Sequence, residues 1–281
     1  MSDISLSGHL SKMVVTPSIS GQPVNYELVL DEQRVALNTL LGNMLTLSWQ
    51  GAIHCSHCGR KTKTSFAQGY CYPCFKALAQ CDSCMMSPEK CHFAAGTCRE
   101  PAWAEQVCFN DHIVYLANSS GLKVGITRAT QMPTRWLDQG AAQALPIARV
   151  KNRRLSGLLE DLLRQQVADK TNWRTLLKGN AEALDLPAER DRLFDLFAGD
   201  IAAVEQREGP GSVQLLDNAA TETFIYPVMH YPQKITSLSF DKTPDVSGRL
   251  QGIKGQYLLL DSGVINLRKF TSYHISFSVQ D

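Results

Sequence analysis

Two short runs near the middle of the chain are rich in apolar and β-branched residues, and a polar turn separates them. Residues 112–117 and 122–127 flank an Asn-Ser-Ser-Gly turn, and this pattern predicts a β-hairpin. Gly125, within the second run, indicates a bulge or a close approach to the backbone. Pro133 favours the start of a short helix, which Gly140 would end. The predicted local order is therefore strand, strand, helix.

Downstream of this segment the apolar residues recur at helical spacing. Five leucines share one face of a predicted helix over 152–166, with Glu160 off that face: Leu155, Leu158, Leu159, Leu162 and Leu163. Pro187 starts a further helix in the position that proline favours. The Arg-Glu-Gly-Pro-Gly cluster at 207–211 then predicts a boundary.

Beyond residue 211 the hydrophobic period changes to two, which predicts short strands. Their ranges are 223–228, 234–240, 248–260, 264–268 and 273–279. Such even spacing favours a small barrel, of OB-like or SH3-like form. Residues 4–53 also read as strands, and Ser7-Gly-His-Leu echoes Ser247-Gly-Arg-Leu. A single β module built from both ends of the chain is the alternative.

Eight of the nine cysteines lie within 55–98. The first four form two CxxC pairs close to the separation of a zinc ribbon: Cys55, Cys58, Cys71 and Cys74. Two such turns supply four thiolates to one tetrahedral ion, and the segment between them is polar. We therefore predict a structural zinc site that folds with its metal, with free thiols or a redox pair as the alternative.

A second group of four cysteines follows and predicts a second structural zinc site: Cys81, Cys84, Cys91 and Cys98. The fourth ligand is open, because His92, Cys108 or His112 could replace one of the sulfurs. An iron–sulfur cluster would also accept four thiolates, but the paired CxxC spacing of the first site favours zinc.

Composition changes this picture only in part. The 28 basic and 27 acidic residues leave a net charge of +1, which gives no general argument for a nucleic-acid or membrane partner. No signal peptide and no long apolar segment is visible, so we expect a cytoplasmic protein with reduced thiols and no membrane partner. No Ser/His/Asp triad, P-loop or dinucleotide fingerprint is visible either, so enzymes of those types lack support.

The segment that follows the cysteines carries an excess of positive charge. From Gly121 to Arg154 there are seven basic residues and one acidic residue, a local charge of +6. Such a segment would attract phosphate, although a solvated basic surface is the alternative.

Two tripeptides occupy the predicted hairpin, Ile113-Val-Tyr115 and Lys123-Val-Gly125. With the helices that follow, they resemble the GIY-YIG nuclease domain over about residues 111–166. The first tripeptide lacks the glycine of the family's first motif, and the second has lysine where the family has tyrosine. The arginine and the metal-binding glutamate of the family correspond to Arg135 and Glu160.

This resemblance implies a division of labour. Tyr115 and Lys123 would help to position or activate the attacking water, and Arg135 would stabilise phosphate charge. Glu160 would hold one Mg or Mn ion. The surrounding residues that we expect to contact nucleic acid are Arg128, Trp136, Arg149, Lys151, Arg153 and Arg154. For the tryptophan, a place in the core is the alternative to stacking on a base.

Longer segments resemble an uncharacterised bacterial family that carries only a domain-of-unknown-function label. They are Gly69-Tyr-Cys-Tyr-Pro-Cys-Phe, Gly96-Thr-Cys-Arg-Glu-Pro, Lys123-Val-Gly-Ile-Thr-Arg and Pro133-Thr-Arg-Trp-Leu-Asp-Gln-Gly. This resemblance implies no activity.

The sequence thus predicts an α+β protein with four parts. They are an N-terminal β segment (1–53), a double zinc-binding module (54–110), a GIY-YIG-like αβ core with helices (111–208) and a C-terminal β-barrel-like domain (212–281). The leading hypothesis is a zinc-stabilised protein that binds DNA or RNA, with divalent-metal-dependent endonuclease activity as its catalytic form. The alternatives are a non-catalytic protein-interaction or assembly module with structural zinc, and a thiol redox sensor.

Overall fold

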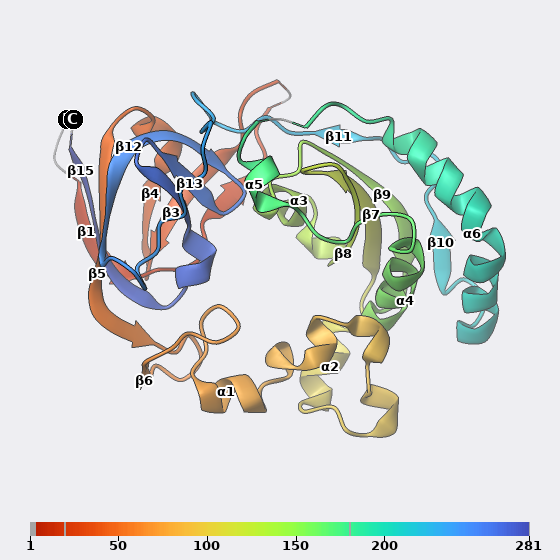
Figure 1. The fold of residues 1–281 in the computed structure, drawn as a ribbon. Coiled ribbons are helices and arrows are strands. Elements are labelled where there is room, and N and C mark those ends of the chain that lie inside the picture. Colours follow the sequence, from red (N-terminus) through yellow and green to blue (C-terminus); the bar gives the residue numbers. More distant parts are fainter. Residues whose placement is uncertain (1–3, 20, 180, 281) are drawn as a thin grey trace.

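The computed structural model describes residues 4–19, 21–179 and 181–280, and it has three regions (Figure 1). Strands from both ends of the chain form a β module. The middle of the chain forms an αβ core. Residues 55–110, here called the cysteine module, lie below both in the view of Figure 1. The fold is mixed α/β with antiparallel sheets.

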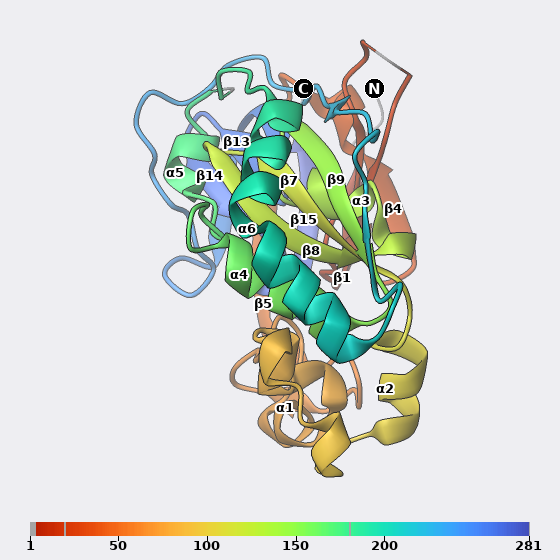
Figure 2. The ribbon, with the colours of Figure 1, turned by 90° about the vertical axis from the view of Figure 1, so that its right-hand side faces the viewer.

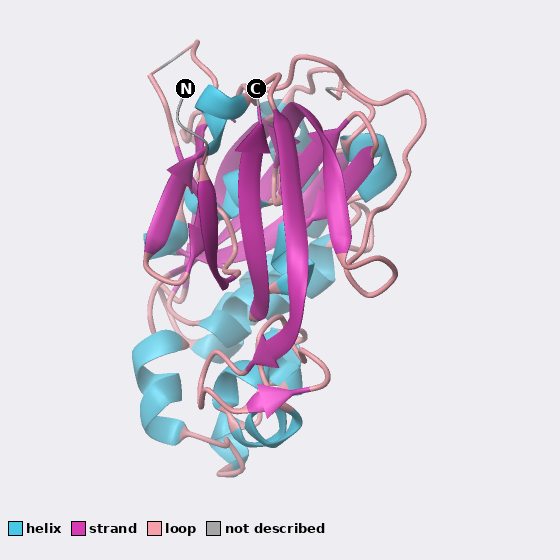
Figure 3. Cartoon of the chain, turned by 90° about the vertical axis from the view of Figure 1, so that its left-hand side faces the viewer, coloured by secondary structure: helices cyan, strands magenta, loops and turns pink. Residues whose placement is uncertain are grey.

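The β module contains two sheets. The larger has the order β1 (Ser5–His9), β15 (Tyr273–Gln280), β5 (Met44–His54), β12 (Asp245–Lys254), β13 (Tyr257–Leu260) and β14 (Gly263–Asn266), and β6 (Lys61–Thr62) pairs with β5. The smaller consists of β2 (Val14–Thr16), β3 (Asn25–Leu30) and β4 (Gln33–Ala36). Figure 3 shows the long strands side by side.

The expected C-terminal barrel is wrong, because no closed barrel forms among the described residues. C-terminal strands pair instead with N-terminal ones: β1 with β15, and β5 with both β15 and β12. The segment 234–240, expected as a strand, is a loop with one bridge between Ser237 and Val264. Strands from residues 5–54 and from residues 245–280 therefore share the larger sheet.

The sequence echo between the two ends marks a repeated structural unit. Strands β1, β3, β4 and β5 recur as β12, β13, β14 and β15, and a short 3-10 helix precedes the last strand in each copy. A Cβ at Gly8 would lie 2.8 Å from Asp31 Oδ2, and one at Gly248 would lie 2.7 Å from Asp261 Oδ1. Each carboxylate accepts the N–H of the residue after the glycine, at 3.0 and 2.9 Å. The glycine leaves room for this contact in both copies.

The two copies exchange strands across the middle of the large sheet. The first strand of each copy pairs with the last strand of the other, and the two last strands pair centrally with Leu47 opposite Phe277. Both side chains are fully buried in the main apolar core. One continuous core therefore stabilises both ends of the chain.

The αβ core is built on a sheet of order β10-β9-β7-β8, with β11 paired to β9. Its strands are β7 (His112–Asn118), β8 (Leu122–Arg128), β9 (Gln143–Val150), β10 (Val213–Leu215) and β11 (Glu222–Thr223). Its helices are α3 (Thr134–Asp138), α4 (Arg153–Leu163), α5 (Trp173–Leu176) and α6 (Leu186–Glu208). In Figure 2, α4 and α6 lie over one face of this sheet. The hairpin and the starts of α3, α4 and α6 agree with the sequence pattern.

Local signals account for the helix ends. The Asn152 side chain accepts the N–H of Leu155 and caps α4, and Asp185 caps α6 with Pro187 in its first turn. Gly209 follows α6, as the breaker cluster predicts. That cluster does not end the core, because β10 and β11 return to β9.

The cysteine module has two short helices, α1 (Tyr72–Ala77) and α2 (Pro101–Val107), and several 3-10 turns. One of these turns, η4 (Pro88–Lys90), packs against Gly157 of α4. A Cβ at Gly157 would lie 2.6 Å from the Glu89 backbone nitrogen and 2.7 Å from Pro88 Cβ. The absence of a side chain there permits this contact.

A buried carboxylate in α3 ties the αβ core to the β module. Asp138 accepts hydrogen bonds from Lys12 Nζ at 2.7 Å and from Gln256 Nε2 at 2.9 Å. Gln256 also bonds the backbone of Met13 through both ends of its amide. In the part of the chain that is described, no helix is long and apolar enough to cross a membrane.

The glycine–aspartate contact predicts the effect of Gly248→Ala. The added methyl group would press on Asp261 and on Leu260 Cβ, so we expect a loss of about 1–3 kcal/mol of unfolding free energy. Denaturant unfolding would measure it. Gly199→Ala in α6 is the control, because nothing lies within 4 Å of its Cβ position, and it should add about 0.5–1 kcal/mol. Equal effects of the two substitutions would contradict the contact.

Candidate metal centre and polar site

Four cysteines of the cysteine module converge on one point. Cys55 directly follows β5, Cys58 lies in the turn after it, Cys71 precedes α1 and Cys74 lies in α1. Their four sulfur atoms all lie within 4.8 Å of one another, and the Cys58 and Cys71 sulfurs are 3.7 Å apart. This quartet is a candidate metal centre.

The local backbone explains why the first two thiols face one point. The Gly59 N–H donates to the Cys55 carbonyl at 2.9 Å, which closes a tight turn, and Gly59 has a φ of +69°. Such a left-handed conformation favours glycine. Burial opposes ionisation of Cys55, but backbone N–H groups of Cys71 and Cys58 lower the pKa of its thiol to about 6.

This donor set suits zinc. Zinc accepts four thiolates in a tetrahedron, and its positive charge favours loss of the thiol protons. All nine cysteines of the chain are free thiols in the structure. The first predicted ligand set is thus brought together and could bind a zinc ion.

The second predicted set is not brought together as expected. Cys84 clusters instead with Asp82 and His92, whose ligand atoms lie within 4.8 Å of one another. The buried Cys81 thiol has its pKa raised by burial, and the charges that act on it belong to Arg99, Cys55 and Glu100. Cys81 belongs to neither cluster of ligand atoms.

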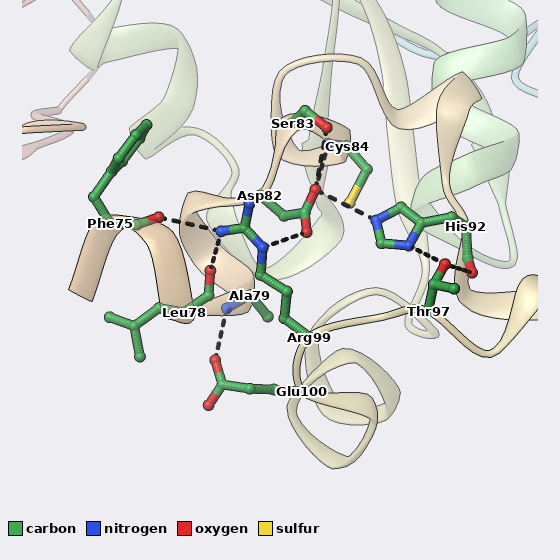
Figure 4. Close-up of polar contacts among 10 residues, drawn as sticks. All are labelled: Phe75, Leu78, Ala79, Asp82, Ser83, Cys84, His92, Thr97, Arg99 and Glu100. Atoms are coloured by element: carbon green, nitrogen blue, oxygen red, sulfur yellow. Dashed lines mark hydrogen bonds and ion pairs between the residues drawn. The ribbon is translucent and has the colours of Figure 1, made fainter. Parts of the chain in front are cut away.

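Asp82 is the hub of the polar network around Cys84 (Figure 4). Its carboxylate pairs with Arg99 Nε at 2.8 Å and with His92 Nε2 at 3.3 Å, and it accepts the N–H of Cys84. Arg99 also donates to the carbonyls of Phe75 and Leu78. The network links the two halves of the module without an apolar core.

The αβ core contains a buried polar site around Gln139. Tyr115 of β7 donates its hydroxyl to Gln139 Oε1 at 2.9 Å, and Lys123 of β8 donates Nζ to the same oxygen at 2.6 Å. Lys123 Nζ also donates to Thr171 Oγ1 at 3.0 Å. Tyr115 is fully buried and Lys123 nearly so.

Gly125 makes room for the tyrosine. Residues 115 and 125 face each other across the hairpin, and a Cβ at Gly125 would lie 2.6 Å from the Tyr115 hydroxyl oxygen. The glycine that the sequence pattern marked for close approach is therefore required by the Tyr115 ring.

Arg135 of α3 and Glu160 of α4 share this electrostatic environment. Burial raises the pKa of Glu160 to about 7, the charge of Asp169 adds to the rise, and Arg135 opposes it. Burial lowers the pKa of Lys123 to about 8, Arg135 lowers it further, and Glu160 opposes the fall. Burial also raises the pKa of Tyr115, and Arg135 opposes that rise. Tyr115 and Lys123 thus meet at Gln139, and the charges of Arg135 and Glu160 act on both of them.

The residues expected to contact nucleic acid do not all lie at the surface. Trp136 is fully buried and packs near Tyr115 and Phe224, so its ring has no exposed face for a base, and the core alternative is correct for it. Its indole occupies the core beneath α3 because the short helix must bury an apolar side chain against the sheet.

Several of the predicted nucleic-acid contacts have protein partners. Arg149 pairs with Asp111 at 3.3 Å, and Arg154 pairs with Glu208 at 3.0 Å. These acids lie outside the segment whose charge we counted, so the surface is less positive than that count suggests.

The other basic residues lie around the end of β9 and the start of α4. Lys151 donates to the Pro210 carbonyl at 3.3 Å, and Arg153 donates to the Met85 carbonyl at 2.7 Å. Arg128 ends β8 opposite the buried His112.

Sequence reasoning missed three members of the polar site: Gln139, Asp169 and Thr171. Gln139 lies next to Asp138 at the end of a predicted helix, and nothing in its spacing distinguishes it from a surface residue. Asp169 and Thr171 follow α4 in a loop, where a strand or helix period gives no signal.

The fold and the quartet together define a mixed α/β protein with a candidate metal centre of four cysteines. A family model described as "Protein of unknown function (DUF2797)" matches residues 42–275. The chain therefore belongs to this family, which confirms the domain-of-unknown-function resemblance. Searches of the curated proteins and of the solved structures each found no match.

The convergence of the four cysteines predicts that Cys58→Ser binds less zinc. Loss of one of four ligands should lower the zinc content by about one ion per chain, because serine is a poor zinc ligand. The loss of zinc should also increase cleavage by a protease within residues 55–78. Metal analysis and limited proteolysis would measure both effects. His57→Ala, an exposed neighbour, should change neither, and a zinc content unaffected by Cys58→Ser would refute the site.

The raised pKa of Glu160 predicts a pH-dependent effect of Glu160→Gln. The ordinary pKa of a glutamate carboxyl is 4.5, whereas the pKa of Glu160 in the folded chain is about 7. Between these two pH values the folded state therefore binds more protons than the unfolded state. The stability that the neutral carboxyl contributes is complete below pH 4.5 and is lost as the pH rises through 7. Glutamine cannot ionise.

The stability of Glu160→Gln relative to the parent chain should therefore increase from about pH 5 to about pH 8. Denaturant unfolding at both pH values, without added Mg or Mn, measures the difference. Acid effects on the cysteines are common to both chains and cancel. A difference that stays constant with pH would contradict the burial of Glu160.

Proposed function

We propose that this protein binds DNA or RNA and hydrolyses a phosphodiester at the polar site of Tyr115, Lys123, Arg135 and Glu160, with zinc in the four-cysteine centre as a structural ion. One observation carries the proposal. The four residues come from β7, β8, α3 and α4, in the order of the GIY-YIG arrangement, and act on one another electrostatically. A cytoplasmic location and a bacterial source remain predictions.

The charges suit a phosphodiester. Arg135 opposes the raised pKa of Glu160 and adds to the lowered pKa of Lys123, so it supplies positive charge to both. A guanidinium in a site of low dielectric stabilises the oxygens of a phosphoryl group in the transition state. Arg135 is thus the proposed phosphate-binding residue.

Glu160 is the proposed ligand of a divalent Mg or Mn ion. Its carboxyl group is half-buried and has a raised pKa, so a cation that replaces the proton would relieve the unfavourable burial of its charge. Such an ion, when bound, would polarise a phosphoryl oxygen.

Lys123 takes the position of the family's second tyrosine. Its Nζ is fixed by Gln139 and Thr171, and its pKa of about 8 allows proton exchange near neutral pH. We assign to this nitrogen, together with the Tyr115 hydroxyl, the orientation of the attacking water.

Nucleic-acid cleavage by paired gels tests the proposal. Zinc-loaded full-length protein should shift labelled DNA or RNA at low salt and cleave it with added Mg or Mn. Glu160→Gln should keep the shift and lose cleavage by about 100-fold or more, because it removes the proposed ligand of the added ion. Asp161→Asn, the adjacent acid on α4, is the matched control and should cleave normally.

The remaining outcomes are decisive in different ways. A shift without cleavage would refute the proposed hydrolysis and support a protein that only binds nucleic acid. Absence of any shift at low salt would overturn the proposal and favour the protein-interaction module, in which zinc only shapes a surface. Equal cleavage by Glu160→Gln would refute the assignment of the metal ligand.

A further inference from the structure

A threonine fixes the position of the proton on the His92 ring. The Thr97 hydroxyl donates to the His92 carbonyl at 3.3 Å, so its oxygen is the acceptor in the 2.8 Å hydrogen bond with Nδ1 of the ring. Nδ1 therefore carries the proton, an assignment that follows from the hydrogen-bond network. In the neutral imidazole, the other ring nitrogen, Nε2, then has a lone pair and no proton.

This unprotonated nitrogen faces a second acceptor. Nε2 of His92 lies 3.3 Å from the carboxylate oxygen Oδ1 of Asp82. Arg99 binds the other carboxylate oxygen at 2.8 Å, and Oδ1 accepts the Ser83 hydroxyl and the Cys84 N–H. A carboxyl group that receives an arginine and two such donors is ionised. Two lone pairs would therefore face each other between Asp82 and a neutral His92, which is unfavourable unless a proton or a metal ion lies between them.

The Cys84 sulfur is a third ligand atom at this point (Figure 4). Asp82 caps the 3-10 turn η3 (Ser83–Met85) by accepting the Cys84 N–H, which brings the two side chains together. The ligand atoms of Asp82, Cys84 and His92 all lie within 4.8 Å of one another. In a tetrahedral zinc site the ligand atoms are roughly 3–4 Å apart, given bonds of about 2.0 Å to nitrogen and about 2.3 Å to sulfur. A small closure of these three side chains would place them on one ion.

The atoms of these side chains that point away from the cluster are held by other residues. Thr97 accepts the Nδ1–H of His92, and Arg99 binds Oδ2 of Asp82 while it also donates to the Phe75 and Leu78 carbonyls. A histidine that binds a metal ordinarily donates its other ring N–H to an oxygen, and a carboxylate ligand is itself hydrogen-bonded. The surrounding residues thus orient Nε2 and Oδ1 as the outer residues of a metal site do.

The cluster is accessible from one side. The Asp82 side chain is 8% exposed, whereas the His92 side chain is 31% exposed. His92 also lines a cavity of about 490 Å³, together with Phe109 and Asn152. An ion and a water molecule can therefore reach the cluster past the histidine ring.

We propose that Asp82, Cys84 and His92 bind a second zinc ion, with a water molecule as the fourth ligand. Zinc accepts a carboxylate oxygen, a thiolate and an imidazole nitrogen, and three protein ligands with one water are the composition of an open zinc site. The Cys84 thiol would lose its proton to solvent on binding, and the two charges of the ion would balance the thiolate and the carboxylate. This inference rests neither on the proposed cleavage reaction nor on a zinc ion in the four-cysteine centre.

Zinc content in matched variants tests this ligand set. The full-length chain, purified with zinc, should hold about two ions, and His92→Ala should hold about one. Cys91→Ser, which changes the adjacent residue, should still hold about two, because its sulfur lies outside the cluster. Inductively coupled plasma mass spectrometry and native mass spectrometry give the count. The comparison is between variants, so it does not depend on the occupancy of the four-cysteine centre.

Two further measurements separate loss of a ligand from misfolding. His92→Cys should restore about two ions, because a thiolate can replace an imidazole. X-ray absorption at the zinc edge should show nitrogen or oxygen ligands besides sulfur in the parent chain, and sulfur only in His92→Ala.

The proposal is overturned if His92→Ala keeps both ions, if Cys91→Ser loses one, or if His92→Cys holds no more zinc than His92→Ala. Sulfur ligands alone in the parent chain would also overturn it, and would mean that a proton rather than a metal ion joins His92 to Asp82.

Discussion

The cysteine module has to be held together without an apolar core. Among the described residues, none of the clusters of buried apolar side chains includes a residue between Cys58 and Val107. Leu78 and Ala104 are buried, but neither belongs to one of these clusters. The Asp82–Arg99 ion pair and backbone turns supply only modest net stability in water. A zinc ion in the four-cysteine centre would add bonds strong enough to order such a segment, and it would link metal binding to folding.

The consequences of that linkage reach the αβ core through one helix. Helix α4 is capped by Asn152, meets the module at Gly157 and carries Glu160 one turn later. Arg153, in its first turn, is fixed to the module by backbone contacts. A shift of the module would therefore move α4, and with it the carboxyl group that interacts with Arg135 and Lys123. The two sites are separate in chemistry but joined in geometry.

Local patterns in the sequence were sufficient for the elements that depend on neighbours along the chain. The hairpin, helix α4, the start of α6 at Pro187 and the first set of four cysteines follow from turn residues, periodicity and CxxC spacing. Strand partners were not predictable in this way, because a period of two shows that a strand exists but not which strand it meets. The pairing of β1 with β15 joins opposite ends of the chain. Only the echo around Gly8 and Gly248 indicated that arrangement.

The sequence described the polar site and the second cysteine set only in part, because the missing information lies in side-chain packing. Gln139 accepts bonds from both Tyr115 and Lys123, a role that only the packed core reveals. Cys81 and Cys84 have CxxC spacing, yet the extended residue Asp82 separates the two 3-10 turns that carry them. Spacing therefore indicates that two thiols can share an ion, and the turn between them decides whether they do. Burial then moves the pKa values of Glu160 and Lys123 toward neutrality, so the charges of both side chains depend on the packing of the core rather than on their spacing along the chain.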